Sequence, residues 1–152
     1  MLLVVSISIS CSIQDDYQLP NHQEWLKTHP YSVGQTTLLL VDNSRDRPVK
    51  TEIWYPSLDT SQLSVSSEYP FELPPTSKDA KMVDGKHPLI VLSHGTGGNR
   101  MSLMWLACEL VGKGYIVAAV DHFGNTFDNS IPEHFVKIWD RPKDISFLLD
   151  VL

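Results

Sequence analysis

A run of five residues, LIVLS at 89–93, leads directly into a loop of glycine and small residues, HGTGG at 94–98. Because glycine carries no Cβ, such a loop can bring several backbone N–H groups close to one bound group. A dinucleotide fingerprint G-x-G-x-x-G needs its third glycine where this chain has Arg100, and no P-loop ending in Gly-Lys-Ser or Gly-Lys-Thr occurs. The stretch therefore predicts a backbone anion site at a strand end, and such a site suits the oxyanion that forms during acyl transfer.

The side chains around this loop predict structural roles rather than a complete catalytic centre. Asp121 and His122 are adjacent, like a dyad, but neighbouring strand residues point to opposite faces and cannot readily hydrogen-bond to each other. We expect this pair to shape a loop and to line the cleft. We expect His94 to support the glycine loop, since a general base must reach the proton of a nucleophile. Ser93 stands outside any G-x-S-x-G pattern and is expected to be structural.

Two further groups of residues have simple interpretations. Cys108 falls in the middle of an apolar helical stretch, which favours a buried and unreactive thiol. Arg141 and Asp144 stand near the start of a predicted helix, where we expect a local charge pair or a cap.

Composition excludes several classes of partner. The net charge of −6 argues against nucleic acid and anionic membrane surfaces, because both need a basic face. The two cysteines form no C-x-x-C motif, and the pairs Asp121–His122 and Glu133–His134 have no third ligand at a usual spacing. We therefore predict neither a metal site nor a cofactor.

Hydrophobic patterning predicts elements that would place the glycine loop. Residues 36–44 and 49–56 alternate or run apolar around a polar turn, which predicts an antiparallel hairpin. Residues 57–86 are rich in Ser, Pro and charge and are expected to form a long surface excursion. Beyond it we expect a strand buried on both faces, a helix, a second buried strand in parallel pairing, and a last helix, at 89–93, 103–111, 115–122 and 139–152.

The loop and its flanking segments resemble those of the α/β-hydrolase superfamily. In particular, WLACELVGKGYIVAAVDHFGNT at 105–126 and WDRPKDISFLLD at 139–150 resemble the platelet-activating-factor acetylhydrolase and dienelactone-hydrolase-like branch. The resemblance covers roughly residues 34–152. It implies an α/β-hydrolase fold in which the Thr96 backbone N–H is an oxyanion-hole donor. It also implies that His94, Gly95, Gly97 and Gly98 shape the loop.

The sequence contains no G-x-S-x-G, the elbow on which this superfamily places its nucleophile. We therefore expect a truncated fold: an N-terminal antiparallel hairpin and parallel βαβ strands, with the nucleophile-elbow strand and later elements missing. The predicted function is the N-terminal part of a serine carboxylic-ester hydrolase, inactive as this isolated chain, whose substrate is a small-molecule ester or lipid. The alternatives are a non-catalytic fragment and a binding module that reuses the half-fold.

The amino terminus predicts a targeting segment. MLLVVSISISC is apolar with small residues before Cys11, and it resembles the end of a bacterial lipoprotein signal in which that cysteine is lipidated. The alternative is a hydrophobic start without a signal function. We thus divide the chain into a possible export or lipoprotein signal (1–11), a leader (12–34) and the N-terminal half of a hydrolase domain (35–152). Export to the periplasm, with membrane contact only through a lipid anchor, is the expected location.

Overall fold

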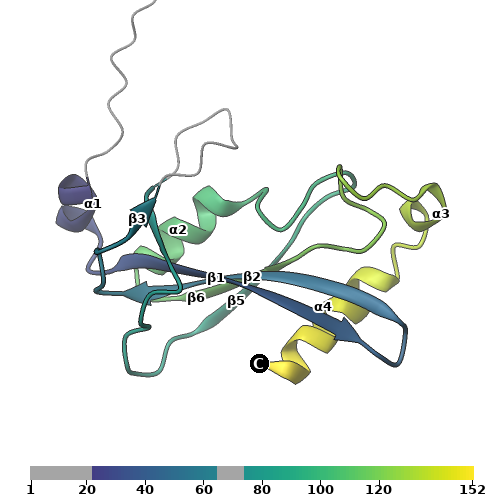
Figure 1. Ribbon diagram of the computed structural model, residues 1–152, viewed down its shortest axis with the longest axis horizontal. Coiled ribbons are helices and arrows are strands. Elements are labelled where there is room, and N and C mark those ends of the chain that lie inside the picture. Colours follow the sequence, from purple (N-terminus) through teal and green to yellow (C-terminus); the bar gives the residue numbers. More distant parts are fainter. Residues whose placement is uncertain (1–21, 65–73) are drawn as a thin grey trace, which may run out of the picture.

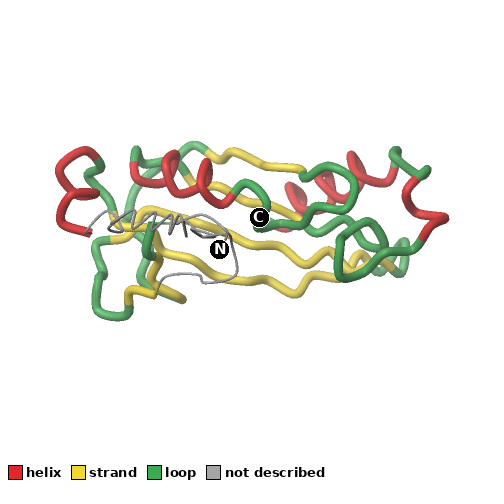
Figure 2. The backbone as a smooth tube through the Cα atoms, turned by 90° about the horizontal axis from the view of Figure 1, so that it is seen from above, coloured by secondary structure: helices red, strands yellow, loops and turns green. Residues whose placement is uncertain are grey.

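The computed structural model describes residues 22–64 and 74–152, so the proposed signal and Cys11 lie outside the described residues. Its centre is a six-stranded mixed sheet in the order β3-β4-β1-β2-β6-β5. Figure 1 shows helix α2 (Met104–Gly112) above this sheet and helix α4 (Asp140–Val151) below it. In Figure 2 the strands run along the long axis of the molecule. Within the described part of the chain, no helix is both long enough and apolar enough to cross a membrane.

The predicted hairpin is present and is longer than expected. Strands β1 (Ser32–Asp42) and β2 (Arg47–Ser57) pair antiparallel from Ser32↔Ser57 to Asp42↔Arg47. The connecting turn contains Asp46 at a φ of 48°, a conformation that Asp tolerates better than most residues. Because β1 begins at Ser32, residues 32–34 of the predicted leader lie in the sheet.

A short helix precedes the hairpin and belongs to the same core. Helix α1 (His22–Thr28) carries Trp25, whose side chain is 7% exposed. The Trp25 indole Nε1–H donates to the Tyr31 carbonyl and its ring stacks on His29 at 3.7 Å between centroids. Helix α1 therefore packs through Trp25 into the core on the α2 side of the sheet.

The βαβ unit is confirmed, with one correction to its burial. Strands β5 (Leu89–Ser93) and β6 (Ile116–Val120) are parallel, with Leu89 opposite Ile116 and Ser93 opposite Val120. Strand β6 is inside the sheet and almost wholly buried. The prediction that β5 is buried on both faces is wrong, because β5 is the last strand of the described sheet and its residues are half-buried or exposed.

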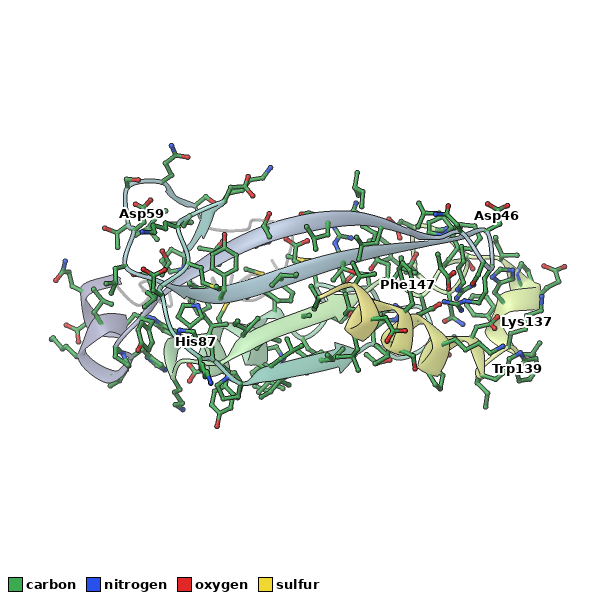
Figure 3. The ribbon with its side chains drawn as sticks, turned by 90° about the horizontal axis from the view of Figure 1, so that it is seen from below. Asp46, Asp59, His87, Lys137, Trp139 and Phe147 are labelled. Carbon is green, nitrogen blue, oxygen red and sulfur yellow. The ribbon has the colours of Figure 1, made fainter. Side chains whose placement is uncertain are left out.

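The long excursion is only partly irregular. It contains the short strands β3 (Leu63–Ser64) and β4 (Thr76–Lys78), which pair with each other, and β4 adds to the sheet parallel to β1. After β6 the chain forms a loop, the short helix α3 (Pro132–Phe135) and then α4. Figure 3 shows that the hairpin turn at Asp46 lies at the same end of the molecule as Lys137 and Trp139, just before α4.

Alternation along β6 divides the core into two layers. Val117 and Ala119 pack on the α2 side together with Trp54 and Met104. Ala118 and Val120 face the other way and pack with Val49 of β2 and Leu148 of α4. The same alternation sends the residues that follow β6 to opposite faces of the sheet, which decides how the site is built.

We predict that Leu148→Ala lowers the free energy of unfolding by about 2–5 kcal/mol, because it leaves a cavity where α4 meets the sheet. The matched control is Leu149→Ala on the same helix, where the side chain is 52% exposed and the expected change is under about 0.5 kcal/mol. The unfolding free energies of both variants are measured by urea unfolding of the full-length protein. Equal effects of the two substitutions would contradict this packing of α4.

Candidate functional site: the glycine loop and its supports

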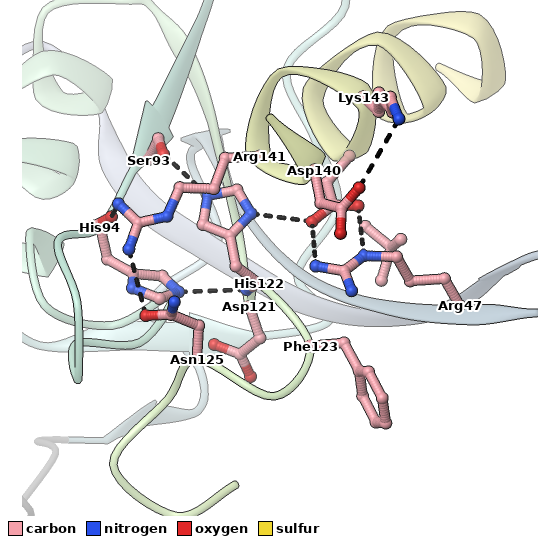
Figure 4. A network of polar contacts seen from close by, with 12 residues as sticks. Arg47, Ser93, His94, Asp121, His122, Phe123, Asn125, Asp140, Arg141 and Lys143 are labelled. Carbon is pink, nitrogen blue, oxygen red and sulfur yellow. Dashed lines mark hydrogen bonds and ion pairs between the residues drawn. The ribbon is translucent and has the colours of Figure 1, made fainter. Parts of the chain in front are cut away.

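The glycine loop lies where two parallel strands end. It follows β5, and the loop that starts with Asp121 follows β6, so both emerge at the carboxyl edge of the sheet. Open α/β sheets commonly place their ligands at this edge. Figure 4 shows the side chains that meet there from β2, β5, the loop after β6, and α4.

His94 anchors the first residue of the loop. Its ring is buried, and the His122 backbone N–H donates to His94 Nε2 at 3.1 Å. Nε2 is therefore unprotonated, and Nδ1 carries the proton that it donates to the Gly95 carbonyl at 2.6 Å. Burial lowers the pKa of His94, so the imidazole stays neutral at neutral pH. The contacts of His94 are those of a loop support, and they leave neither ring nitrogen free to act as a base.

The middle of the loop is exposed. Gly95, Thr96 and Gly97 all lie at the surface, and a Cβ added at Gly95 or Gly97 would meet nothing within 4 Å. Gly97 has a φ of 73°, which favours glycine, and its N–H donates to the Asn125 carbonyl at 3.2 Å. Gly98 N–H closes the turn onto the Gly95 carbonyl at 3.1 Å. The backbone of the loop is thus fixed from beneath and accessible from outside.

Arg141 of α4 reaches the same loop. Its guanidinium donates to the His94 carbonyl at 3.3 Å, to Thr96 Oγ1 at 3.1 Å and to Asn125 Oδ1 at 3.1 Å. The expectation of a local pair between Arg141 and Asp144 is wrong, because the two side chains serve different partners. Sequence reasoning treated Arg141 as a feature of its own helix and missed these contacts, which span 16 to 47 residues along the chain.

Ser93, His122 and Asp144 form a continuous chain of hydrogen bonds on the α4 side of the sheet. Ser93 Oγ lies 2.7 Å from His122 Nε2, and His122 Nδ1 lies 2.9 Å from Asp144 Oδ2. The ionised Asp144 can only accept, so His122 Nδ1 carries a proton, and the Ser93 hydroxyl lies within hydrogen-bond distance of Nε2. This is the hydrogen-bond order of a Ser-His-Asp triad. Sequence reasoning missed it, although Ser93 ends β5 and His122 follows β6 by two residues, so both lie at the same edge of the sheet.

The Asp144 carboxylate is already balanced by two guanidiniums. Arg47 binds it through Nε at 2.7 Å and Nη2 at 2.9 Å, and Arg45 Nη1 lies 3.0 Å from Oδ1. Burial of Asp144 raises its pKa, but the hydrogen bonds from His122, Arg47 and Arg45 outweigh burial and bring the pKa to about 2. Asp144 is therefore ionised at neutral pH and shared among three donors.

This sharing argues against Ser93 as a nucleophile. Arg45 also pairs with Asp42, so two carboxylates already face two guanidiniums. Transfer of the Ser93 proton to His122 would put a positive charge on a fully buried ring beside a carboxylate that two guanidiniums already neutralise, while the negative charge stays on the Ser93 oxygen. Burying an unbalanced charge is costly. We interpret the chain of hydrogen bonds as a structural tie between β2, β5, the loop after β6, and α4.

The Asp121 side chain lies on the opposite face of the sheet from His122, because neighbouring side chains alternate along an extended chain. Its Oδ1 accepts the Arg100 backbone N–H at 2.6 Å and its Oδ2 accepts Arg100 Nη1 at 2.8 Å. Arg100 Nε also donates to Glu52 Oε2 at 3.0 Å, and Glu52 is 1% exposed. Arg100, the residue that excludes a dinucleotide fingerprint, therefore fixes the far end of the glycine loop to β2.

The other candidate residues take no part in the glycine loop or its supports. Cys108 is fully buried, as predicted, and burial raises the pKa of its thiol to about 12. His134 contacts the Phe123 carbonyl through Nδ1 at 3.1 Å. Across residues 22–64 and 74–152, no three or more His, Cys, Asp or Glu side chains cluster so that they could hold a metal ion.

Comparisons with known proteins agree with this geometry. The family described as "Platelet-activating factor acetylhydrolase, isoform II" matches residues 66–131. A solved structure of ferulic acid esterase from Streptomyces cinnamoneus is similar to this chain with a TM-score of 0.67 and 27% sequence identity. The resemblance to the acetylhydrolase-like branch of the α/β-hydrolases is confirmed. The match covers 82% of this chain and 47% of the esterase, so this chain spans about half the length of that enzyme.

We predict that Asp144→Asn destabilises the α/β-hydrolase fold at neutral pH by about 3–5 kcal/mol, because the buried Arg47 guanidinium loses its counter-charge and the half-buried Arg45 keeps only Asp42. The lowered pKa of Asp144 means that its stabilisation is full above about pH 4 and is lost as the pH falls towards about 2. The difference between wild type and variant in urea unfolding should therefore shrink over that range. Asp150→Asn, an exposed change on the same helix, is the control. A difference independent of pH would contradict the assignment.

We predict that a fluorophosphonate probe leaves Ser93 unlabelled, because the Asp144 carboxylate is already paired with Arg45 and Arg47 and has little charge left to stabilise an imidazolium. The measurement is mass spectrometry of the tryptic peptide 87–100, which contains Ser93, with chymotrypsin labelled in parallel as the positive control. Stoichiometric label on Ser93 that disappears in His122→Gln would show instead that the hydrogen-bond chain activates the serine.

Proposed function

We propose that this chain supplies the oxyanion-loop half of a carboxylic-ester hydrolase acting on a small-molecule ester or lipid. The observation that carries the proposal is the loop at 94–98. Its exposed residues Gly95–Gly97 follow a parallel strand at the carboxyl edge of the sheet, and a buried histidine and an arginine hold it from beneath. The family and esterase similarities support the same reaction class.

The proposed role of Thr96 follows from the chemistry of ester cleavage. Attack on an ester carbonyl forms a tetrahedral intermediate with a negatively charged oxygen. A backbone N–H that is already in place stabilises that charge without reorganising during the reaction. In this proposal the Thr96 N–H is one donor, and the attacking serine, the base and the acid lie outside these 152 residues. The chain alone is then inactive.

We also propose export with lipid attachment at Cys11. The support is the apolar start of the sequence and the small residues before that cysteine. An ester hydrolase held at a membrane surface by a lipid would meet its substrate outside the cytoplasm.

The test is hydrolysis of p-nitrophenyl acetate by the protein expressed from the complete reading frame. We expect activity in wild type and a loss of about a hundredfold to a thousandfold in kcat for Thr96→Pro, which removes the backbone N–H. Thr96→Ser keeps both the N–H and the hydroxyl and should retain activity. Urea unfolding of both variants separates lost chemistry from lost folding. A well-folded wild type without hydrolysis would favour a binding module or non-catalytic fragment and overturn the proposal.

A further inference from the structure

We propose that Arg141 is the positioning residue of the glycine loop, and that α4 sets the conformation of the oxyanion site through it. The inference rests on the proposed function, since the loop is taken to be the oxyanion site. It adds a residue from a helix that follows the loop by more than 40 positions in the sequence.

The contacts of Arg141 fall on both sides of the proposed donor. The guanidinium donates to the carbonyl of His94 and to the hydroxyl of Thr96. It therefore holds the backbone just before the Thr96 N–H and the side chain just after it. The same guanidinium binds Asn125 Oδ1, while the Asn125 carbonyl accepts the Gly97 N–H. Arg141 thereby closes a ring of contacts that joins the glycine loop to the loop after β6.

The backbone of Arg141 is held in place by the buried contacts of α4. Three residues further along α4, Asp144 is fully buried and bound by Arg47 and His122, and Leu148 one turn later is in the core. Movement of α4 would break these buried contacts. The position of the guanidinium is therefore fixed by the helix, and the loop adapts to the guanidinium rather than the reverse.

Arginine suits this place for two physical reasons. Its planar fork can serve several oxygen acceptors at once, which the single ammonium of lysine cannot do with the same geometry. In addition, all three acceptors are neutral, and within the described ranges Arg141 forms no ion pair. Its positive charge is therefore not cancelled locally and adds to the attraction for a developing negative charge on the loop.

The experiment compares Arg141→Ala and Arg141→Lys with Lys143→Ala, an exposed change on the same helix. In p-nitrophenyl acetate hydrolysis by the protein from the complete reading frame, we expect kcat of Arg141→Ala to fall about a hundredfold while KM stays within about twofold, since a misplaced donor affects the transition state more than substrate binding. Arg141→Lys should recover part of the loss, and added guanidinium ion should partly rescue Arg141→Ala. Lys143→Ala should match wild type.

A second measurement keeps this inference separate from the proposed function. Hydrogen exchange of the Gly97 amide, which donates to Asn125, should become faster in Arg141→Ala than in Lys143→Ala, whether or not the protein hydrolyses esters. If the wild type is inactive but Gly97 exchange is faster in Arg141→Ala, the proposed function is contradicted and the positioning role is supported. An active wild type whose kcat and Gly97 exchange survive Arg141→Ala would overturn the positioning role.

Discussion

The buried carboxylate of Asp144 is the constraint on which the site end of the molecule depends. An ionised carboxylate removed from water costs several kcal/mol unless its oxygens are fully paired. Asp144 achieves this only when β2 presents Arg47, the turn presents Arg45 and the loop after β6 presents His122. The hairpin, the parallel strands and α4 must therefore dock together, and the glycine loop acquires its supports in the same event.

The sheet separates two charged networks that both end at the glycine loop. On the α2 side, Glu52 and Asp121 hold Arg100 just after the loop. On the α4 side, His122 and Arg141 hold the loop at its start. The loop is thus fixed at both ends by contacts from opposite faces, while its middle stays accessible. An oxyanion site needs this combination, because its donors must be rigid before the charge develops.

Local patterns predicted the elements well, and they predicted side-chain partners poorly. The hairpin, the parallel pair and the helices follow from hydrophobic periodicity, which acts over a few residues. The edge position of β5 depends on which strands surround it, and an apolar run such as LIVLS does not encode that. Asp144 and Arg141 were assigned to each other because they are close in sequence. Their real partners lie 16 to 99 residues away and become neighbours only through the topology.

The pairing of Arg47 with Asp144 also bears on how the long hairpin chooses its alignment. Strands β1 and β2 pair over 11 positions, and several neighbouring registers would keep most backbone hydrogen bonds. A shift of β2 by one residue would turn Arg47 to the other face and leave Asp144 without the two hydrogen bonds from its guanidinium. The buried ion pair therefore disfavours misaligned hairpins and contributes to the uniqueness of the folded state.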